Sequence, residues 1–361
     1  MARSWAVLVI VCACTFFDPL DQAGLGVILL PADTALYVGS SFTARGRMAN
    51  AYGDQYPSEH IRYAGLDPSA TVGPDGTVTG VSYGRARVVV TRGDFADMGW
   101  VSVVPLGTLA LSKISEQSTV DIVNADGSGF TSIASSGQFG GGAPAWLPGN
   151  AGLVYQFATP GGAGSTQIFV TDLAGNSTSL AASGRDPRVS RDGNWVYFGD
   201  AGAIRRVHPN GTGLELVSGG GDYTPDPSPD STQLVFASTR FTGGGSQLAV
   251  RDLIAGAEES LSTQGWMPRW APSGNEIAYW SGDISSQPAR GAIFVIGANG
   301  AGAHQVSAAG RRYWPQGLDW SPDGQWLLAR SDSTLDLIQV TTGLTLPLGY
   351  AADYHLASWR W

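Results

Sequence analysis

The sequence predicts an all-β protein with a β-sandwich over residues 24–105 and a six-bladed β-propeller over residues 106–361. Two observations predict this. A motif of a Pro or Trp-Ser-Pro segment, an Asp-Gly turn and an apolar run recurs through the last 250 or so residues. Before it, short strand-like runs follow one another at a spacing of roughly ten residues, which is typical of a sandwich. The 50 glycines and 20 prolines fit many short strands joined by turns.

The repeat sets the number of blades. The central residue of each copy of the motif is Trp146, Val189, Pro227, Trp270, Trp320 or Trp359. Successive copies are separated by 43, 38, 43, 50 and 39 residues. Each period contains about four strand signals, and a period near forty residues with four strands indicates one propeller blade per repeat.

The two ends of the repeat region predict how the ring closes. The last copy, Ser358-Trp359-Arg360-Trp361, has no strands after it, and the first strands, near 109–112 and 120–123, have no copy before them. Joining the two completes a sixth blade and removes two open sheet edges. We therefore expect the C-terminal strand to close the ring.

The clearest copy, Asp319-Trp320-Ser321-Pro322-Asp323-Gly324, and the runs Ile168-Phe169-Val170-Thr171-Asp172 and Ile277-Ala278-Tyr279-Trp280 resemble the repeat of TolB-type six-bladed propellers. The resemblance covers residues 108–361. In that family the propeller docks a peptidoglycan-associated lipoprotein. That partner is not carried over, because the preceding residues here are not of the TolB type.

Residues 24–105 show a second resemblance. The segments Ala70-Thr71-Val72, Gly76-Thr77-Val78-Thr79-Gly80-Val81 and Gly84-Arg85-Ala86-Arg87-Val88 are similar to the late part of bacterial Ig-like domains of group 2. That family often carries Trp where this chain has Tyr63. The resemblance implies a sandwich that serves as a spacer or adhesive module on an exported protein.

Residues 1–23 are expected to be a signal sequence. Arg3 precedes a short apolar run, Ala6 to Ala13, which is too short to span a bilayer but fits a signal-peptide core. The sequence Val11-Cys12-Ala13-Cys14 resembles a bacterial lipobox, although Cys12 stands where the family has a small residue. The resemblance implies lipidation of Cys14 and a periplasmic or surface location. The alternatives are ordinary cleavage near residues 13–23 and an uncleaved apolar stub.

Composition limits the possible functions. The net charge is −9, which argues against general nucleic-acid binding because phosphate affinity comes mainly from Lys and Arg. Four histidines lie far apart in sequence, and both cysteines lie near the start, so no metal site and no cofactor are expected. Asp126, Asp172, Asp252 and Asp323 are interpreted as turn residues and not as calcium ligands.

Candidate ligand-binding residues come from position. In this fold the residues just before each repeat motif border the axial mouth on one face. Those proposed for the mouth are Arg185, Arg188, Tyr223, Trp266, Arg269, Tyr313, Trp314 and His355. An aromatic rim with a few arginines suits a peptide, an acidic chain or a glycan. The alternative interpretation is that these aromatic residues only pack between blades.

The function expected is non-catalytic binding of an envelope protein, peptide or glycan through the propeller face. No α/β stretch that could hold a Gly-x-Ser-x-Gly nucleophile elbow is predicted, and no catalytic residue is predicted. One alternative is a propeller lyase or glycoside hydrolase acting at the mouth, for which Asp186, Asp222 and Asp226 are candidate carboxylates. A second is an adhesin that binds through the sandwich. The oligomeric state stays open.

Overall fold

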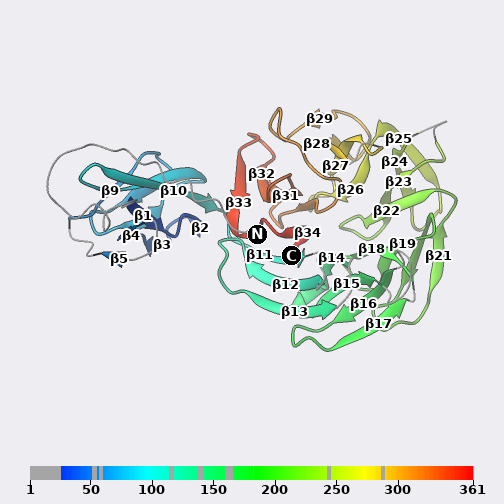
Figure 1. Ribbon diagram of the computed structural model, residues 1–361. Helices are drawn as coiled ribbons and strands as arrows, with labels where there is room; N and C mark the ends of the chain where they lie inside the picture. The colour runs from blue at the N-terminus through cyan, green and yellow to red at the C-terminus, as the bar shows by residue number, and fades with distance from the viewer. Residues whose placement is uncertain are drawn as a thin grey trace. The chain divides into compact units, whose positions relative to one another are not determined.

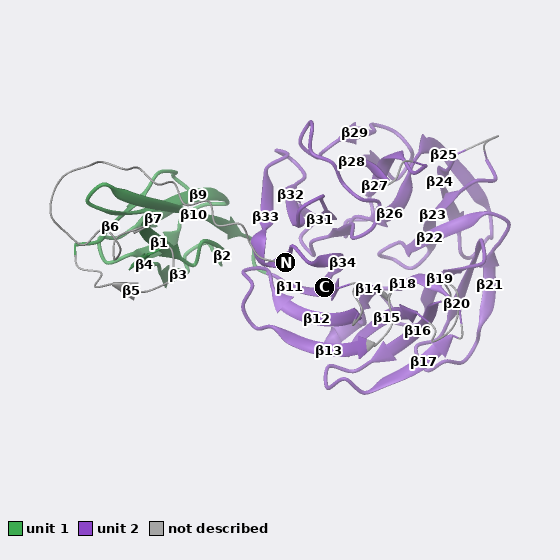
Figure 2. Ribbon diagram, viewed as in Figure 1, with its two compact units in different colours: residues 1–106 green, residues 107–361 purple. Residues whose placement is uncertain are grey.

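The chain forms two compact units, residues 1–106 and 107–361, in a computed structural model (Figure 2). The structure describes residues 26–50, 55–56, 60–113, 118–136, 141–158, 166–181, 183–241, 245–285 and 289–360. The predicted signal sequence and Cys14 lie outside these residues. Within them, no helix is long and apolar enough to cross a membrane.

The described residues of the first unit form ten strands in three sheets, ordered β1-β4-β5, β2-β10-β9-β6 and β3-β8-β7. The strands are β1 (Gly26–Leu30), β2 (Asp33–Tyr37), β3 (Ser41–Thr43), β4 (Arg45–Ala49), β5 (Gln55–Tyr56), β6 (Arg62–Gly65), β7 (Ala70–Val72), β8 (Thr77–Gly80), β9 (Gly84–Arg92) and β10 (Phe95–Val104). They lie close to the strand-like runs of the sequence.

The core of this unit follows from alternation along its strands. In β9, Ala86, Val88 and Val90 are buried while the residues between them are more exposed, as expected for a half-buried strand. Tyr63 packs against this core, and its hydroxyl accepts a hydrogen bond from the Gly46 amide at 2.8 Å. The Ig-like assignment of this unit stays a prediction.

The second unit contains, among the described residues, six sheets of four strands each (Figure 1). Blade 1 is β34 (Tyr354–Trp359), β11 (Thr108–Lys113), β12 (Ser118–Asn124) and β13 (Thr131–Ser136); blade 2 is β14 (Gly141–Trp146), β15 (Leu153–Ala158), β16 (Thr166–Thr171) and β17 (Ser177–Ala181); blade 3 is β18 (Arg185–Val189), β19 (Val196–Asp200), β20 (Ala203–Val207) and β21 (Glu215–Ser218).

The other three blades follow in chain order. Blade 4 is β22 (Asp222–Pro227), β23 (Gln233–Ser238), β24 (Gln247–Asp252) and β25 (Glu258–Gln264); blade 5 is β26 (Trp266–Trp270), β27 (Glu276–Asp283), β28 (Arg290–Gly297) and β29 (His304–Gln305); blade 6 is β30 (Asp319–Trp320), β31 (Trp326–Arg330), β32 (Leu335–Gln339) and β33 (Thr345–Leu348). Two short 3-10 turns, Pro148–Asn150 and Gly349–Ala351, complete the regular structure of this unit.

The innermost strands form a closed ring. Each of β34, β14, β18, β22, β26 and β30 contacts the next, and β30 contacts β34 again. β34 pairs antiparallel with β11, with Leu109 opposite Trp359 and Leu111 opposite Ala357. The last strand of the chain therefore completes the blade begun by the first strands of this unit, and the predicted all-β fold with a six-bladed propeller is confirmed.

The repeat motif marks the end of each innermost strand. All six aligned residues, from Trp146 to Trp359, are the last residue of their strand. Three of the tryptophans are tied to a neighbouring segment through the indole: Trp320 Nε1 donates to the Arg269 carbonyl at 3.0 Å, and Trp280 Nε1 donates to the Tyr313 carbonyl at 2.9 Å. Trp146 Nε1 makes a longer bond of 3.4 Å to Ser358. These bonds link neighbouring blades.

The Asp-Gly turns are held by side chains. In blade 6, Ser321 Oγ lies 2.5 Å from Asp323 Oδ1 and accepts a hydrogen bond from the Trp326 amide at 2.9 Å. Blades 3 and 4 repeat this turn with Ser190 and Ser228. The four aspartates interpreted as turn residues each accept a backbone amide two residues ahead, as expected for Asx turns.

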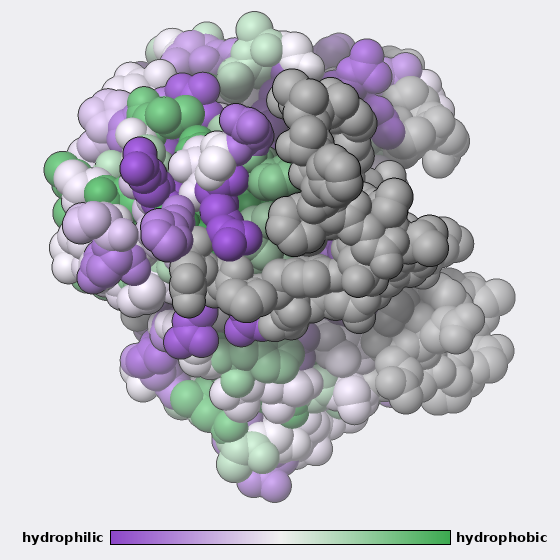
Figure 3. Space-filling view, turned by 60° about the vertical axis from the view of Figure 1, so that its left-hand side comes forward, coloured by the Kyte–Doolittle hydropathy of each residue, from purple (hydrophilic) through white to green (hydrophobic). Residues whose placement is uncertain are grey.

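Exposed apolar residues are scattered. The face drawn in Figure 3 shows hydrophobic residues in small groups separated by hydrophilic ones. The most exposed large apolar side chains, Ile254 (86%) and Leu106 (77%), lie far apart in sequence. Scattered apolar residues of this kind are ordinary on a protein surface, so they do not by themselves indicate a binding face.

Candidate ligand-binding mouth of the propeller

A bulge recurs in the innermost strands and positions the candidate site. The pairing register shifts between Gly142 and Ala145, Arg185 and Arg188, Tyr223 and Asp226, and Trp266 and Arg269. In each bulge a non-glycine residue precedes a proline and has a positive φ: 43° at Ala143, 50° at Asp186, 53° at Thr224 and 51° at Met267. A bulge bends its strand and redirects the flanking side chains.

Three of these four bulge residues line a cavity of about 530 Å³. Asp186, Thr224 and Met267 come from blades 3, 4 and 5, and they are joined by Arg185, Tyr223, Trp266 and Gln316. The volume lies within the range of small-molecule and peptide sites. Residues from the innermost strands of blades 3, 4 and 5 therefore border one common hollow.

The wall of this cavity combines aromatic and polar groups. The rings of Tyr223 and Trp266 lie 5.7 Å apart at an angle of 48°. Thr224 is 6% exposed, and its Oγ1 has no hydrogen-bond partner among the described residues. The Asp186 amide is held by Gln156 Oε1. A buried hydroxyl without a partner costs free energy unless a ligand or water satisfies it.

Beneath the mouth, the axis of the ring is filled by charged side chains. Arg188 Nε lies 3.7 Å from Asp226 Oδ1, and Arg188 Nη1 lies 3.5 Å from Asp319 Oδ1. Arg269 Nε and Arg188 Nη2 both donate to the Leu318 carbonyl at 3.2 Å. The remaining space is small, since the cavities above and below Arg188 hold about 20 Å³ each. A ligand at the mouth therefore meets a floor and not an open channel.

Burial shifts the pKa values of the charged side chains in and around the axis. Burial raises the pKa of Asp186 above its usual value even though Arg269, Arg188 and Arg185 oppose the shift. The same cause raises the pKa of Asp226 against Arg188 and Arg269. Burial also lowers the pKa of Arg269 to about 10, and the neighbouring Arg188 adds to that shift. Desolvation thus outweighs the pairing of these charges.

The structure divides the eight predicted mouth residues into three groups. Arg185, Tyr223 and Trp266 line the cavity. Arg188 and Arg269 point inward but fill the axis below it, where they are 8% and 5% exposed. The remaining three, Tyr313, Trp314 and His355, do not line the cavity.

The placement of Tyr313 at the mouth is wrong. Its side chain is fully buried, and its backbone bridges Gly291 and Ser331. Burial raises the pKa of its hydroxyl. The reason is the local sequence: blade 6 has the shortest inner strand among the described residues, Asp319–Trp320, so Tyr313 lies well before it and packs in a core cluster with Trp280 and Trp320, while Gln316 reaches the cavity.

Trp314 and His355 are half-buried elsewhere. The Trp314 amide donates to the Arg330 carbonyl at 2.9 Å, and its Nε1 is buried without a partner among the described residues. His355 lies within β34, where burial lowers the pKa of its imidazole and Arg330 adds to the shift. These two residues were wrongly placed for the same reason, since the motif of blades 6 and 1 lacks the bulge proline.

Several wall residues were missed from the sequence. Ser183, Asp200 and Ile284 line the cavity from loops and strand ends outside the repeat motif. Asp226 and Asp319, which balance the axial arginines, sit one position before the end of their strands. The alignment of strand ends could have found these two aspartates, because it places Ala145, Arg188, Asp226, Arg269, Asp319 and Ser358 at the same position.

The candidate carboxylates do not gather in the cavity. Asp186 lines it, but Asp222 is paired with Arg240 at 2.8 Å and Asp226 faces the axis. Asp200, the second acid of the wall, is paired with Arg205 at 2.9 Å. Within the described ranges, no group of three His, Cys, Asp or Glu side chains could hold a metal ion.

Comparisons with known proteins bear on the fold. No family model matches the chain. The uncharacterized protein Atu1656 of Agrobacterium fabrum is 35% identical over 111 residues, which cover 26% of this chain and 38% of that protein. The match spans well under half of the relative's length, so it does not show a family.

Solved structures match more of the chain. TolB from Acinetobacter baumannii superposes with a TM-score of 0.59 at 17% identity, covering 83% of this chain and 82% of that one. A putative TolB from Agrobacterium tumefaciens gives 0.54 at 17% identity over 68% and 89%, and a chain of a nidogen/laminin complex gives 0.55 at 9% identity over 70% and 98%. The second unit therefore has the fold of a TolB-like six-bladed β-propeller.

Proposed function

We propose that this chain is an exported, non-catalytic binding protein that holds a protein, peptide or envelope polymer at the mouth of its propeller. The observation that carries the proposal is the cavity of about 530 Å³, whose wall joins Tyr223, Trp266 and Arg185 to the unpartnered hydroxyl of Thr224. Tyr, Trp and Arg are the residues most enriched at the energetic centres of interfaces.

The charged side chains that fill the axis favour binding of a ligand at the mouth over passage of that ligand through the ring. Arg188, Arg269, Asp226 and Asp319 neutralise one another within the axis, and Arg185 lines the mouth wall. A ligand with an apolar segment and an acidic group would match an aromatic pair beside one arginine. Export to the periplasm or cell surface, with lipidation at Cys14, belongs to the same proposal and rests on the sequence alone.

The mouth proposal predicts which side chains carry affinity. Trp266→Ala and Tyr223→Ala are each expected to weaken capture of a ligand from an envelope extract by about 2 kcal/mol, roughly thirtyfold in Kd. Trp195→Ala is the matched control, since Trp195 stacks on His208 outside the mouth. Equilibrium binding measured with the purified ligand checks this, and equal loss in all three variants would contradict the proposal.

One observation favours catalysis as a second candidate function. Asp186 lines the cavity with a raised pKa, the property of a general acid. A propeller lyase or hydrolase would lose turnover in Asp186→Asn while keeping its affinity. Binding assays on residues 24–105 and 106–361 separately test the third possibility, an adhesin acting through the first unit.

A further inference from the structure

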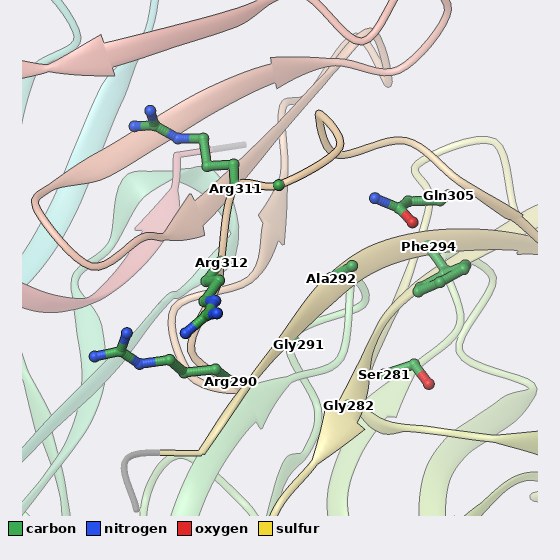
Figure 4. Close-up of a pocket in the computed structure, with 10 residues that line it drawn as sticks. Ser281, Gly282, Arg290, Gly291, Ala292, Phe294, Gln305, Arg311 and Arg312 are labelled. Atoms are coloured by element: carbon green, nitrogen blue, oxygen red, sulfur yellow. The ribbon is translucent and has the colours of Figure 1, made fainter. Parts of the chain in front are cut away.

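A second, larger cavity of about 880 Å³ lies on blade 5, away from the mouth. Strands β27, β28 and β29 and the segment 310–312 form its wall (Figure 4). None of its wall residues belongs to the mouth cavity. The two hollows can therefore be tested independently.

Small side chains create this hollow. Ser281 on β27 is paired with Ala292 on β28, and Gly282 is paired with Gly291. Strand β29 is only two residues long and pairs with Phe294 and Val295. The small side chains of Ser281 and Ala292 leave space at the wall, whereas the space beside Gly282 and Gly291 is taken by Trp280 and by backbone atoms.

The wall is basic. It contains Arg290, Arg311 and Arg312 and no acidic residue. The whole chain has 21 Lys and Arg among 361 residues and a net charge of −9. Arg290 and Arg311 are paired with Asp332 and Asp336 outside the wall, so the net positive charge of the wall comes from Arg312, and this charge favours an anionic ligand.

Two of the three arginines keep donors for a ligand. Arg311 is held by both carboxylate oxygens of Asp336, and in Figure 4 it points away from the other two. Arg290 Nη1 donates to Asp332 at 2.9 Å, but its Nε is buried and has no partner among the described residues. Arg312 is exposed and forms no ion pair with any described residue.

The edge of β28 is closed to an added peptide strand. The Gly291 amide and carbonyl are bonded to Tyr313, and the Ile293 carbonyl accepts the Val306 amide at 3.0 Å. The Ile293 amide donates to Ser307 Oγ. A peptide that binds by extending a sheet needs these backbone groups free. Recognition in this cavity must come from side chains alone.

We propose that the blade 5 cavity binds an acidic saccharide, with Arg290 and Arg312 holding its carboxylate. Guanidinium groups bind carboxylates through charge-assisted, often paired hydrogen bonds. The Gln305 amide nitrogen donates to the Ser307 carbonyl at 2.9 Å, which leaves its Oε1 to accept a hydrogen bond from a sugar hydroxyl. Ser281 adds a hydroxyl, and the Phe294 ring, stacked on Tyr279, offers a flat apolar surface. The volume has room for a sugar of about two units.

The test is calorimetric titration of the full chain with cellobiouronic acid and with cellobiose, which differ only in the carboxylate. Cellobiouronic acid is expected to bind and cellobiose to bind at least about tenfold more weakly. Arg312→Gln is expected to weaken binding of the acid by about tenfold, because it removes one charged donor without touching an internal ion pair.

Controls separate this site from the mouth. Arg185→Gln changes the wall of the mouth and is expected to leave binding of the acid unchanged; Ala292→Leu places a bulky side chain beside Ser281 in the blade 5 wall and is expected to weaken binding of the acid. The melting temperature of each variant shows that it is folded. Equal binding of the two sugars, no binding of the acid, an unchanged Kd in Arg312→Gln, or tighter binding of a tetraglutamate peptide would each overturn the proposal.

Discussion

At the residue scale, charged side chains are buried in the axis of the propeller, and their desolvation costs free energy. Asp186 and Asp226 have raised pKa values because burial outweighs the attraction of the neighbouring arginines. The turn aspartates behave in the opposite way. The pKa of Asp230 is lowered because Ser228 and the Thr232 amide donate hydrogen bonds to its ionised form.

These opposite shifts predict opposite pH dependence. A raised pKa in the folded state gives stability that is present below the unfolded value, 3.8, and is lost as pH rises through the folded value. Asp186→Asn has no carboxyl group to ionise at this position, so this loss of stability at higher pH does not occur. Asparagine also tolerates the positive φ of this position. The melting temperature of the variant relative to the parent chain is therefore expected to be higher at pH 7 than at pH 3.5.

Asp230→Asn is the control for that measurement. Its lowered pKa gives stability that is present above 3.8 and is lost as pH falls through the folded value. The variant is expected to be less stable than the parent chain at pH 7 and to approach it at low pH. If the stability of both variants relative to the parent chain changed with pH in the same direction, the opposite pKa shifts of Asp186 and Asp230 would be refuted.

At the element scale, the serine of the turn motif holds the turn between the innermost strand of a blade and its next strand. Ser321 Oγ caps the Trp326 amide at the start of β31 and fixes Asp323, which in turn holds the Gln325 amide at 3.0 Å. Blade 5 has Ala271 at the corresponding position and lacks this cap. The motif therefore stabilises each blade locally, and a blade can form without one copy.

Removal of this serine should be measurable. Ser321→Ala leaves the buried Trp326 amide without its side-chain acceptor and is expected to lower the free energy of unfolding by about 1–3 kcal/mol. The control is Ser273→Ala, because Ser273 is exposed and only accepts the Asn275 amide at 3.3 Å. Urea unfolding measures both, and an equal effect would contradict a special role for the turn serine.

The sequence predicted the blades better than the mouth, and the reason is local. Five of the six blades are contiguous runs of apolar strands and turn residues, so their pattern is visible in sequence. The mouth is built from residues of several blades and loops, whose local sequences differ. Blades 3, 4 and 5 share the bulge proline, and their residues Arg185, Tyr223 and Trp266 reach the cavity as predicted. Blade 6 lacks it, and Tyr313 is buried instead.

At the scale of the whole molecule, each unit has its own core, and the second depends on closure. β34 brings the end of the chain onto β11, and the Trp359 amide donates to Asp319 Oδ2 at 2.8 Å. Asp319 also lies beside Arg188, so the closing strand is tied to the axial cluster. Both cavities belong to this unit, and the mouth in particular exists only if the ring is closed.

Thermal unfolding of the chain without residues 357–361 tests this closure most directly. The truncation removes Ala357, Ser358 and Trp359, which pair with Leu111, Ala110 and Leu109. It exposes both an edge of β11 and the buried surface around Trp359, which is 1% exposed. We expect a clear fall in melting temperature together with loss of ligand capture at the mouth. A melting curve identical to that of the full chain would contradict a ring fastened by its last strand.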